Sequence, residues 1–420
     1  MTDVSVDDHL VTDLNAYRTA VRDYLAGPAL DRWRGTYLDD DADEMRFSAG
    51  LMRVLYDAGF GRYGMSASAG GLGGDVRHWA VLFDELARAG ITPTGQHSLL
   101  VTLAYPLAKF APELAAAYLP EFLCGDGWWG QGFSESEAGS DLAALRCRAT
   151  RQADDYIISG HKIWTSHAQT ANRIFLLART GTPESRHRGL SMILVDVDAP
   201  GVTVRPIRLA SGRAELAECF FDDVRVPAAR LIGAEGEGWA VAMYLLQYER
   251  ALWAWLRAAV LLQRLRALVG LLPDGAVPAP PGGVDSVGGV SGVGGVDGVD
   301  GVGGVGGAGG AGGVAISEVL GTVYLNLVAL RARSVDTVRR LAAGQTVGPE
   351  ASADKLLLGA CEQSVYDAAR SLLGPAFLFG EASRQWREEW WYSRTTTVYG
   401  GSAEVQRGII ADRVLKLPKE

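Results

Sequence analysis

The sequence predicts a mixed α and β (α+β) fold, in which a helical block is followed by a strand-rich block and a second helical block. Apolar residues recur at helical spacing up to about residue 128, short β-rich runs replace them, and helical spacing returns near residue 237. The 420 residues suffice for two or three domains, and the hydrophobic share of 48% is enough for a real core. We therefore expect domains over residues 1–128, 129–236 and 237–420.

The first block, residues 1–128, is expected to be an α-helical domain. Asp13 has a side chain suited to cap a helix that ends near Leu25. Little in this block predicts strands. Further helices are expected over Phe47–Tyr56, His78–Leu86 and Leu99–Phe110.

The second block, residues 129–236, contains short β-rich runs separated by Gly, Pro, Asp and Ser. Regular short strands with no helices between them indicate a compact antiparallel barrel or sandwich. The runs are Tyr156–Ser159, Ile163–Thr165, Ile174–Ala178, Leu190–Val197, Val202–Ile207 and Cys219–Val226.

The third block, residues 237–420, is expected to be helical again, with Gly236 and Gly238 at its boundary. One long helix is predicted from Trp239 to about Leu271. The other helices are predicted over Ile316–Ala343, Ala351–Leu373 and Ser402–Val414.

A glycine-rich insertion, residues 273–314, separates two of these helices. From residue 282 to residue 314 glycine recurs at every third position except Ser286, and no proline is present to favour a collagen helix. The composition predicts a flexible insertion, and a tether for a partner or a lid is the functional alternative.

Charge and composition exclude several classes of protein. With 40 Lys+Arg against 49 Asp+Glu, the net charge of −9 argues against a nucleic-acid or anionic-membrane partner. The acidic N-terminus does not resemble a signal peptide, and the apolar run Ala251–Leu262 is too short to span a bilayer. The four cysteines lack metal-ligand spacing, which favours reduced thiols in a cytoplasmic protein and no metal site: Cys124, Cys147, Cys219 and Cys361.

Three motifs combine small, hydroxyl and aromatic residues. In Gln131–Asp141, glycines let a backbone approach a flat or anionic ligand, although an ordinary turn has the same composition. In His161–Ser166, a Trp between polar residues can stack on a planar cofactor or lie in the core. In Tyr399–Arg407, two glycines precede Ser402, which can simply cap the next helix.

Together and in this order, these motifs resemble the acyl-CoA dehydrogenase family of flavoproteins. The resemblance rests on SESEAGSD (134–141), KIWTS (162–166), FFDDVRVPAARLIG (220–233) and DRVLKLP (412–418), and covers nearly the whole chain. It implies an α-helical domain, a central antiparallel β-barrel and a C-terminal four-helix bundle, which matches the order of blocks above. It also implies bound FAD.

The resemblance also implies a set of site residues. Gln131, Phe133, Ser134 and Ser140 are expected to line the flavin and the thioester, Ser140 on the substrate side as well. Arg370 and Gly374 match positions that contact FAD from a neighbouring subunit, so a homodimer or homotetramer is expected. The remaining cofactor positions are Trp164, Thr165 and Ser166 against the isoalloxazine, and Ser402 and Glu404 near the cofactor.

The family reaction requires a carboxylate to remove the α-proton of the thioester. Many members place that Glu after the Tyr of the last motif, where this sequence has Gly400, which retains a backbone N–H for the enolate oxygen. A minority places it before an Arg on the first long C-terminal helix. Glu249 and Arg250 stand there, on a largely apolar helix face expected to raise the pKa of the Glu249 carboxyl. The alternative is a structural Glu paired with Arg250, and Arg250 itself has either a substrate or a structural role.

Other features concern substrate and cofactor. Trp253 lies one helical turn from Glu249, and a bulky wall there would favour a short, branched or ring-bearing acyl group, although aromatic residues at helical spacing are more often core. No Arg-x-x-Phe-Gly segment, which in relatives contacts FAD, occurs in Leu271–Val314. Ser136 and Glu137 replace a Pro and a Gly of the flavin loop.

The leading hypothesis is α,β-dehydrogenation of an acyl thioester carried by CoA or by an acyl carrier protein, with an electron-transferring flavoprotein or O₂ as acceptor. The first alternative is a flavin monooxygenase on the same fold, against which Glu249 argues. The second is a non-catalytic subunit of a hetero-oligomeric dehydrogenase, which Gly400 favours.

Overall fold

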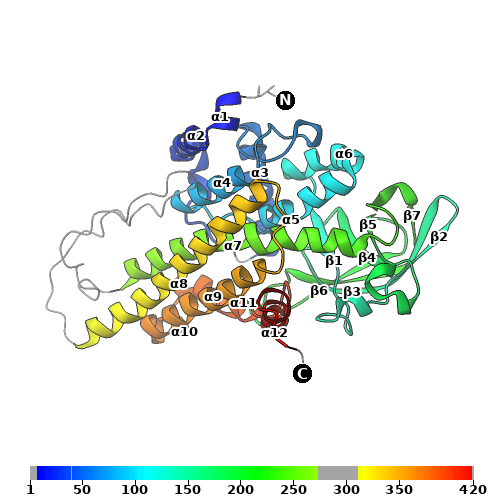
Figure 1. The fold of residues 1–420 in the computed structure, drawn as a ribbon. Coiled ribbons are helices and arrows are strands. Elements are labelled where there is room, and N and C mark those ends of the chain that lie inside the picture. Colours follow the sequence, from blue (N-terminus) through cyan, green and yellow to red (C-terminus); the bar gives the residue numbers. More distant parts are fainter. Residues whose placement is uncertain (1–6, 39, 273–310, 419–420) are drawn as a thin grey trace. The chain divides into compact units, whose positions relative to one another are not determined.

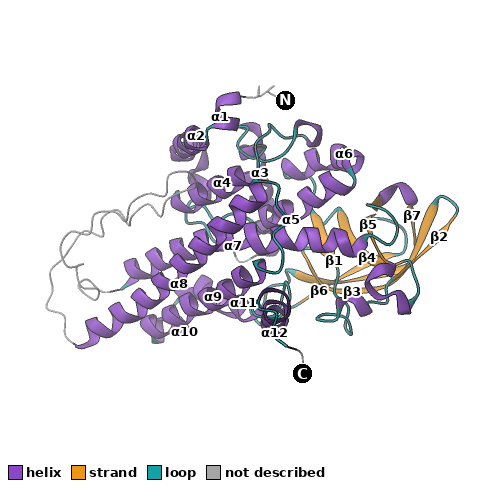
Figure 2. Cartoon of the chain, viewed as in Figure 1, coloured by secondary structure: helices purple, strands orange, loops and turns teal. Residues whose placement is uncertain are grey.

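The chain forms helices and one eight-stranded sheet, in the order helices, strands, helices along the sequence (Figures 1 and 2). The computed structural model describes residues 7–38, 40–272 and 311–418. Helices flank a middle segment in which antiparallel pairs dominate, so the predicted mixed α and β class is confirmed.

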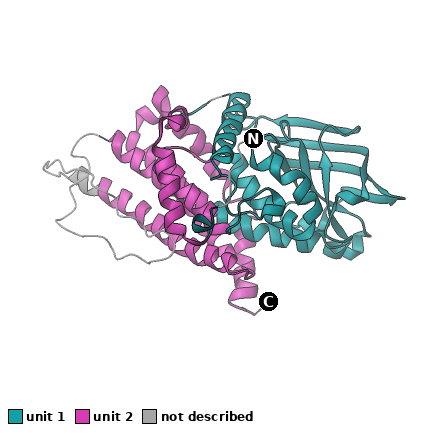
Figure 3. Cartoon of the chain, turned by 90° about the horizontal axis from the view of Figure 1, so that it is seen from above, with its two compact units in different colours: residues 1–11, 36–75, 94–253 teal, residues 12–35, 76–93, 254–420 magenta. Residues whose placement is uncertain are grey.

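Two compact units divide the chain (Figure 3). Unit 1 comprises Met1–Val11, Thr36–Asp75 and Thr94–Trp253, and unit 2 comprises Thr12–Gly35, Val76–Pro93 and Ala254–Glu420. The three sequence-based domain boundaries stay a prediction.

Several helices begin at a capping side chain. The Asp13 carboxylate accepts the backbone N–H groups of Asn15 and Ala16, which confirms the predicted cap. Thr94 and His97 form a capping box at the start of the helix Gly95–Phe110 in unit 1. The helices are α1 (Asp8–Thr12), α2 (Leu14–Ala26), α3 (Asp41–Asp57), α4 (Val76–Arg88), α5 (Gly95–Phe110), α6 (Pro112–Leu123), α7 (Gly238–Leu271), α8 (Ala311–Ala342), α9 (Ala351–Leu373), α10 (Pro375–Phe379), α11 (Arg384–Thr395) and α12 (Ala403–Ile409).

Three helical predictions need correction. Residues 311–314, predicted to belong to the flexible insertion, form the start of α8; residues 273–310 lie outside the described residues. Further along its length, α8 packs against α9. The final predicted helix over Ser402–Val414 is α12 followed by one π-helical turn, Ile410–Val414. Helices α1, α6, α10 and α11 were not predicted.

The sheet runs in the order β6-β7-β3-β2-β4-β5-β8, and β1 pairs with β4. Most pairs are antiparallel, but β1 and β2 run parallel to β4. The strands are β1 (Trp129–Gly132), β2 (Arg148–Gln152), β3 (Asp155–Ser166), β4 (Arg173–Arg179), β5 (Leu190–Asp196), β6 (Val202–Ile207), β7 (Leu216–Pro227) and β8 (Leu231–Ile232).

Strand β3 unites two runs that were predicted as separate strands. It bends at Gly160, where its register with β7 shifts. Gly160 has a φ of 149°, and a Cβ there would lie 2.6 Å from the Cα of Cys147. Glycine is therefore required for the close approach of β2 and β3.

The strand core is apolar and includes two of the four cysteines. Inward residues such as Tyr156, Ile158 and Phe221 are buried between the strands. All four cysteines are free and buried, as expected for reduced thiols. Among the described residues, no helix is both long and apolar enough to cross a membrane.

Candidate active site

The loop that follows β1 is anchored to strand β3 by a buried ion pair. Lys162 is fully buried, and its ammonium lies 2.8 Å from the Glu135 carboxylate and donates to the Phe133 carbonyl at 2.9 Å. Glu135 also accepts the backbone N–H groups of Arg146 and Cys147 at 2.6 and 2.8 Å. Burial opposes ionisation of Glu135, but Lys162 and the backbone donors outweigh it and lower the pKa of this carboxyl.

We expect Lys162→Met to weaken folding most at neutral pH. In the wild type the pKa of Glu135 is lower in the folded than in the unfolded protein. The ionised carboxylate therefore adds to the free energy of unfolding above about pH 4.5, and this addition is lost as the pH falls. Without Lys162, burial raises the pKa of the Glu135 carboxyl. The variant should therefore lose about 3 kcal/mol of the free energy of unfolding at pH 7, and less toward pH 4, where Glu135 becomes neutral. Urea unfolding at the two pH values measures this, and an equal loss at both would contradict it.

A β-bulge presents Trp164 outside the strand core. Lys162 pairs with Cys219 and Thr165 with Ala217, so two residues of β3 face one of β7 between these pairs. Trp164 has a φ of 63°, which is unusual for a bulky residue, and is 53% exposed. The alternative of a core Trp is therefore wrong, and strain of this kind clusters at functional sites.

The neighbours of Trp164 bring the first two motifs together. The Ile163 N–H donates to the Ser134 carbonyl at 3.0 Å, so loop and strand run side by side. Thr165 is fully buried, and its hydroxyl oxygen has no hydrogen-bond geometry with any described group. It nevertheless lies close enough to Cys219 to offset part of the burial that raises the pKa of that thiol to about 11. Ser140 is exposed.

Glu249 reaches this region from helix α7. The Gln131 side-chain amide lies 3.4 Å from a Glu249 carboxylate oxygen, across 118 residues of sequence. Leu245 and Leu252, one turn to either side, are buried, which fits the predicted apolar face. Burial lowers the pKa of the adjacent Arg250 guanidinium against the opposing charge of Glu249, and its Nε has no hydrogen-bond partner among the described residues.

Tyrosines that sequence reasoning missed surround the same turn of α7. The rings of Tyr105 and Tyr248 stack with centroids 4.5 Å apart, and the Tyr248 hydroxyl is 3.0 Å from that of Tyr244. Tyr105 also donates to the Gly64 carbonyl at 2.8 Å. Trp253 is half-buried. The sequence signal that could have found them is the i,i+4 spacing of Tyr244 and Tyr248, which places both on one face of α7.

In unit 2, the last motif forms a tight loop before α12. Gly400 and Gly401 have φ values of 63° and 93°. The buried Gln406 amide donates to both of their carbonyls, at 3.0 and 3.3 Å. The Ser402 hydroxyl accepts the Val405 N–H at 3.3 Å and so caps α12 as predicted. Glu404 is exposed.

A buried charged cluster holds the start of this loop. Glu362, fully buried in α9, accepts hydrogen bonds from Arg257 and from the Thr396 hydroxyl. Burial opposes the charge on Arg257, yet Glu362 holds the pKa of that guanidinium well above its usual value. Lys355 donates to the Thr396 carbonyl, and its ammonium lies 3.9 Å from the Tyr399 ring centroid.

The remaining predicted residues also lie in unit 2. Arg370 is exposed in the last turn of α9, with its guanidinium 5.7 Å from the Trp390 ring centroid. Gly374 has a φ of 53° between α9 and α10. Unit 1 thus gathers Gln131, Phe133, Ser134, Ser140, Trp164, Thr165, Ser166, Glu249, Arg250 and Trp253, and unit 2 holds Arg370, Gly374, Gly400, Ser402 and Glu404.

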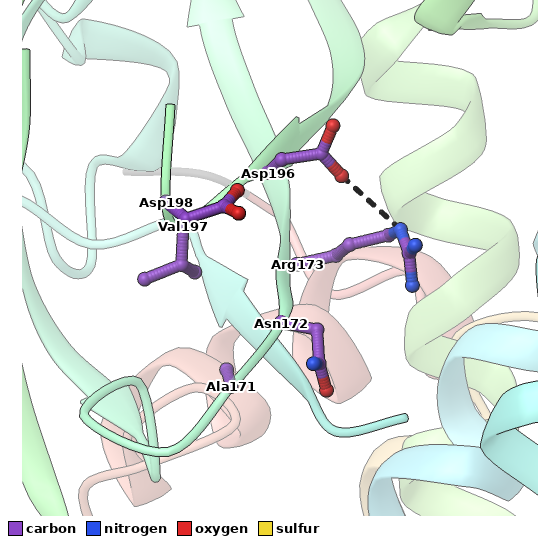
Figure 4. Close-up of a pocket in the computed structure, with 6 residues that line it drawn as sticks. All are labelled: Ala171, Asn172, Arg173, Asp196, Val197 and Asp198. Atoms are coloured by element: carbon purple, nitrogen blue, oxygen red, sulfur yellow. Dashed lines mark ion pairs between the residues drawn. The ribbon is translucent and has the colours of Figure 1, made fainter. Parts of the chain in front are cut away.

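A polar pocket of about 410 Å³ lies elsewhere in unit 1, and none of the predicted site residues lines it (Figure 4). Arg173 lies 3.2 Å from Asp196 in its wall. The Arg173 and Arg230 guanidinium groups both lie over the Tyr118 ring, at 4.2 and 4.6 Å from its centroid. This arrangement is explained by structural ion pairs and cation–π contacts.

Comparison with known proteins identifies the family of the chain. Models of the acyl-CoA dehydrogenase N-terminal, middle and C-terminal domains match residues 12–126, 130–224 and 311–415. The acyl-CoA dehydrogenase IpdE1 of Mycobacterium tuberculosis is 32% identical over 97% of this chain and 99% of its own length.

Two further similarities extend this comparison. The cyclohexane-1-carbonyl-CoA dehydrogenase of Geobacter metallireducens is 30% identical over 58% of this chain and 62% of its own. The solved structure of the Tcur3481-Tcur3483 steroid ACAD superposes with a TM-score of 0.76 at 26% identity, over 97% of this chain and 98% of the other. The chain belongs to the acyl-CoA dehydrogenase family and is an acyl-CoA dehydrogenase-like oxidoreductase.

Proposed function

We propose that the protein catalyses the FAD-dependent α,β-dehydrogenation of an acyl thioester, with Glu249 as the general base. The observation that carries the proposal is the 3.4 Å contact between Glu249 and Gln131, the first residue of the loop that the family resemblance assigns to the flavin. The position of the usual base holds Gly400, so Glu249 is the carboxylate available from the family's alternative position.

The residues present fit FAD. Trp164 offers an exposed ring on a fixed bulge, and Ser134 and Ser166 beside it carry hydroxyl donors. The buried Thr165 hydroxyl lacks a partner of hydrogen-bond geometry among the described residues, which suits a polar group close by. FAD, when bound, supplies an acceptor for the hydride from the β-carbon.

The protein's own groups manage the proton and the developing charge. Glu249 takes the proton from the α-carbon, so its carboxylate must be ionised when the substrate binds. The Gly400 N–H is proposed to donate to the thioester oxygen as negative charge develops there. The largely buried Arg250 guanidinium supplies positive charge beside the base.

A branched or ring-bearing acyl group is the proposed substrate, carried by CoA or by an acyl carrier protein. The proposal rests on Trp253, one helical turn after Glu249 on α7, and on the rings of Tyr105 and Tyr248, which stack beside the same turn of the helix. Two relatives carry names that specify a cyclohexane-1-carbonyl and a steroid substrate. Electrons are proposed to leave to an electron-transferring flavoprotein or to O₂.

Trp253→Ala should widen the acyl pocket. We expect kcat/KM for a bulky cyclic acyl thioester to fall by about tenfold relative to that for a short linear one, because the cyclic group loses its contact with the Trp253 ring. Steady-state kinetics on both substrates measure this, with Trp391→Ala as a control for an exposed Trp. An unchanged ratio of the two kcat/KM values would show that Trp253 does not line the acyl pocket.

A second candidate is a role as one subunit of a hetero-oligomeric dehydrogenase. Gly400 in place of the usual base favours it, and the similar steroid ACAD is named as a pair of proteins, Tcur3481-Tcur3483. Under the leading proposal, the enzyme is instead a homodimer or a homotetramer.

The test of the proposed function is anaerobic bleaching of the purified flavoprotein by a panel of acyl thioesters. Bleaching without O₂ or NAD(P)H supports dehydrogenation. Turnover by the homomer contradicts the non-catalytic role, whereas activity that appears only after a second family-like chain is added supports the hetero-oligomer. A flavin that no thioester reduces in either assembly would overturn the proposal.

A further inference from the structure

We propose that Gln131 is a positioning residue for Glu249: its amide donates a hydrogen bond that keeps the carboxylate ionised and sets its orientation. This goes beyond the cofactor-lining role expected for Gln131 and rests on the proposed function, in which Glu249 is the base. The 3.4 Å separation is long for a hydrogen bond, but catalytic hydrogen bonds are often long in a ligand-free enzyme and shorten when substrate binds.

Strand β1 presents Gln131 on a rigid backbone. A Cβ on Gly130 would lie 3.0 Å from the Thr165 methyl group, and one on Gly132 would lie 2.8 Å from an Ile174 methyl group. The strand is therefore pressed closely against β3 and β4 on the face where these glycines lie. Because side chains alternate along a strand, Gln131 points to the opposite face, and it is the one residue of β1 that is not buried.

The choice of a neutral amide has an electrostatic reason. Burial raises the pKa of a carboxyl, whereas hydrogen bonds to its charged form lower it. A Lys or Arg at residue 131 would form a charge-assisted bond and hold Glu249 too firmly in its ionised form for it to accept a proton. One amide donor opposes burial without that penalty and adds no charge beside the thioester.

Gln131 differs from the other groups near Glu249 because it reaches the carboxylate from a separate element, strand β1. Arg250 is coupled electrostatically to Glu249, but it is the adjacent residue on the same helix. Strand β1 contains no titratable residue, so Gln131 is its polar contact with α7. Titratable side chains that contact this half of α7 include Tyr105 and Lys109 on α5 and His187 beside Trp239, and Tyr244 and Tyr248 lie on α7 itself.

The test is the pH profile of kcat/KM for the full-length flavoprotein carrying Gln131→Met or Gln131→Glu. Gln131→Met keeps the length and removes the donor, so the acidic limb should move up by about one pH unit. Gln131→Glu places two carboxylates together, and the limb should move up by about two units or more. Activity should therefore fall more at pH 6 than on the alkaline plateau.

Gln169→Met is the matched control, because the Gln169 amide donates to the Ala214 carbonyl at 2.6 Å instead of to a carboxylate. Its acidic limb should coincide with that of the wild type. An unmoved limb in Gln131→Met with full flavin content would overturn the proposal. Should that variant fail to fold, Gln131→Asn, which shortens the amide, gives the same test.

A second measurement does not depend on turnover. The Glu249 carboxyl can be titrated by ¹³C NMR in protein labelled at the glutamate δ-carbon, with the signal identified by its absence in Glu249→Gln. Its pKa should rise in Gln131→Met and not in Gln169→Met, and equal values would refute the inference. If Glu249→Gln remains active, the proposed function fails, and this titration still decides whether Gln131 acts on the carboxyl.

Discussion

Replacing Glu249 by glutamine is expected to reduce the rate of flavin bleaching by an acyl thioester by at least about 10³-fold. The amide has nearly the same shape and retains a contact for Gln131, but it cannot accept the α-proton. Thioester binding should survive, because the acyl walls and the proposed Gly400 donor are unchanged. Stopped-flow absorbance under anaerobic conditions measures the bleaching, and a spectral titration with the enoyl thioester product measures binding.

Glu113→Gln is the matched control for this substitution. Glu113 is an exposed glutamate in the first turn of α6, so its loss should leave the bleaching rate within about twofold. If Glu249→Gln bleaches as fast as the wild type, another group removes the proton and Glu249 is structural. If it binds neither flavin nor thioester, the loss of rate would not identify a base, and Glu249→Asp would then be compared at equal flavin content.

Removing the buried carboxylate of Glu362 should strongly destabilise unit 2. Glu362→Leu leaves the Arg257 guanidinium without its ion-pair partner and the Thr396 hydroxyl without its acceptor. Breaking one partner of a buried pair lowers the free energy of unfolding by about 3–5 kcal/mol. The loop that ends at Gly400 should loosen as well, since Thr396 begins it. Urea unfolding measures the loss of stability.

A double-mutant cycle separates the ion pair from packing. Arg257→Leu/Glu362→Leu removes both charges, and this variant should regain much of the stability lost in Glu362→Leu, since no uncompensated charge remains. Glu404→Gln, at an exposed i,i+3 pair with Arg407 on α12, should cost less than about 0.5 kcal/mol. A Glu362→Leu protein as stable as the wild type would mean that Arg257 finds another counter-charge.

Elements with a strong hydrophobic period could be read from the sequence. Helices α7 and α9 lie within a residue of their predicted ends, and β6 matches its prediction. Strand β2 was missed because its burial does not alternate regularly, so its place in the sheet depends on pairing with β3. Helix α11 was missed because its sequence is largely polar.

The candidate site was predicted unevenly for a similar reason. Motifs at fixed spacing identified the flavin loop, the strand with Trp164 and the helix with Glu249. The Lys162–Glu135 pair was missed because, in a sequence, two buried charges look like two surface charges. Only the tertiary structure, which packs the loop after β1 against strand β3, shows that both charges are buried.

The order of the blocks, the family and the candidate base follow from the sequence alone, because they depend on local periodicity and on motifs within a few residues of each other. The tertiary structure alone decided which distant groups meet: Gln131 with Glu249, Lys162 with Glu135, and Glu362 with Arg257. These contacts join segments 27 to 118 residues apart. Their energies depend on burial and on distances of a few ångströms, which are set by how the strands and helices pack rather than by the order of residues.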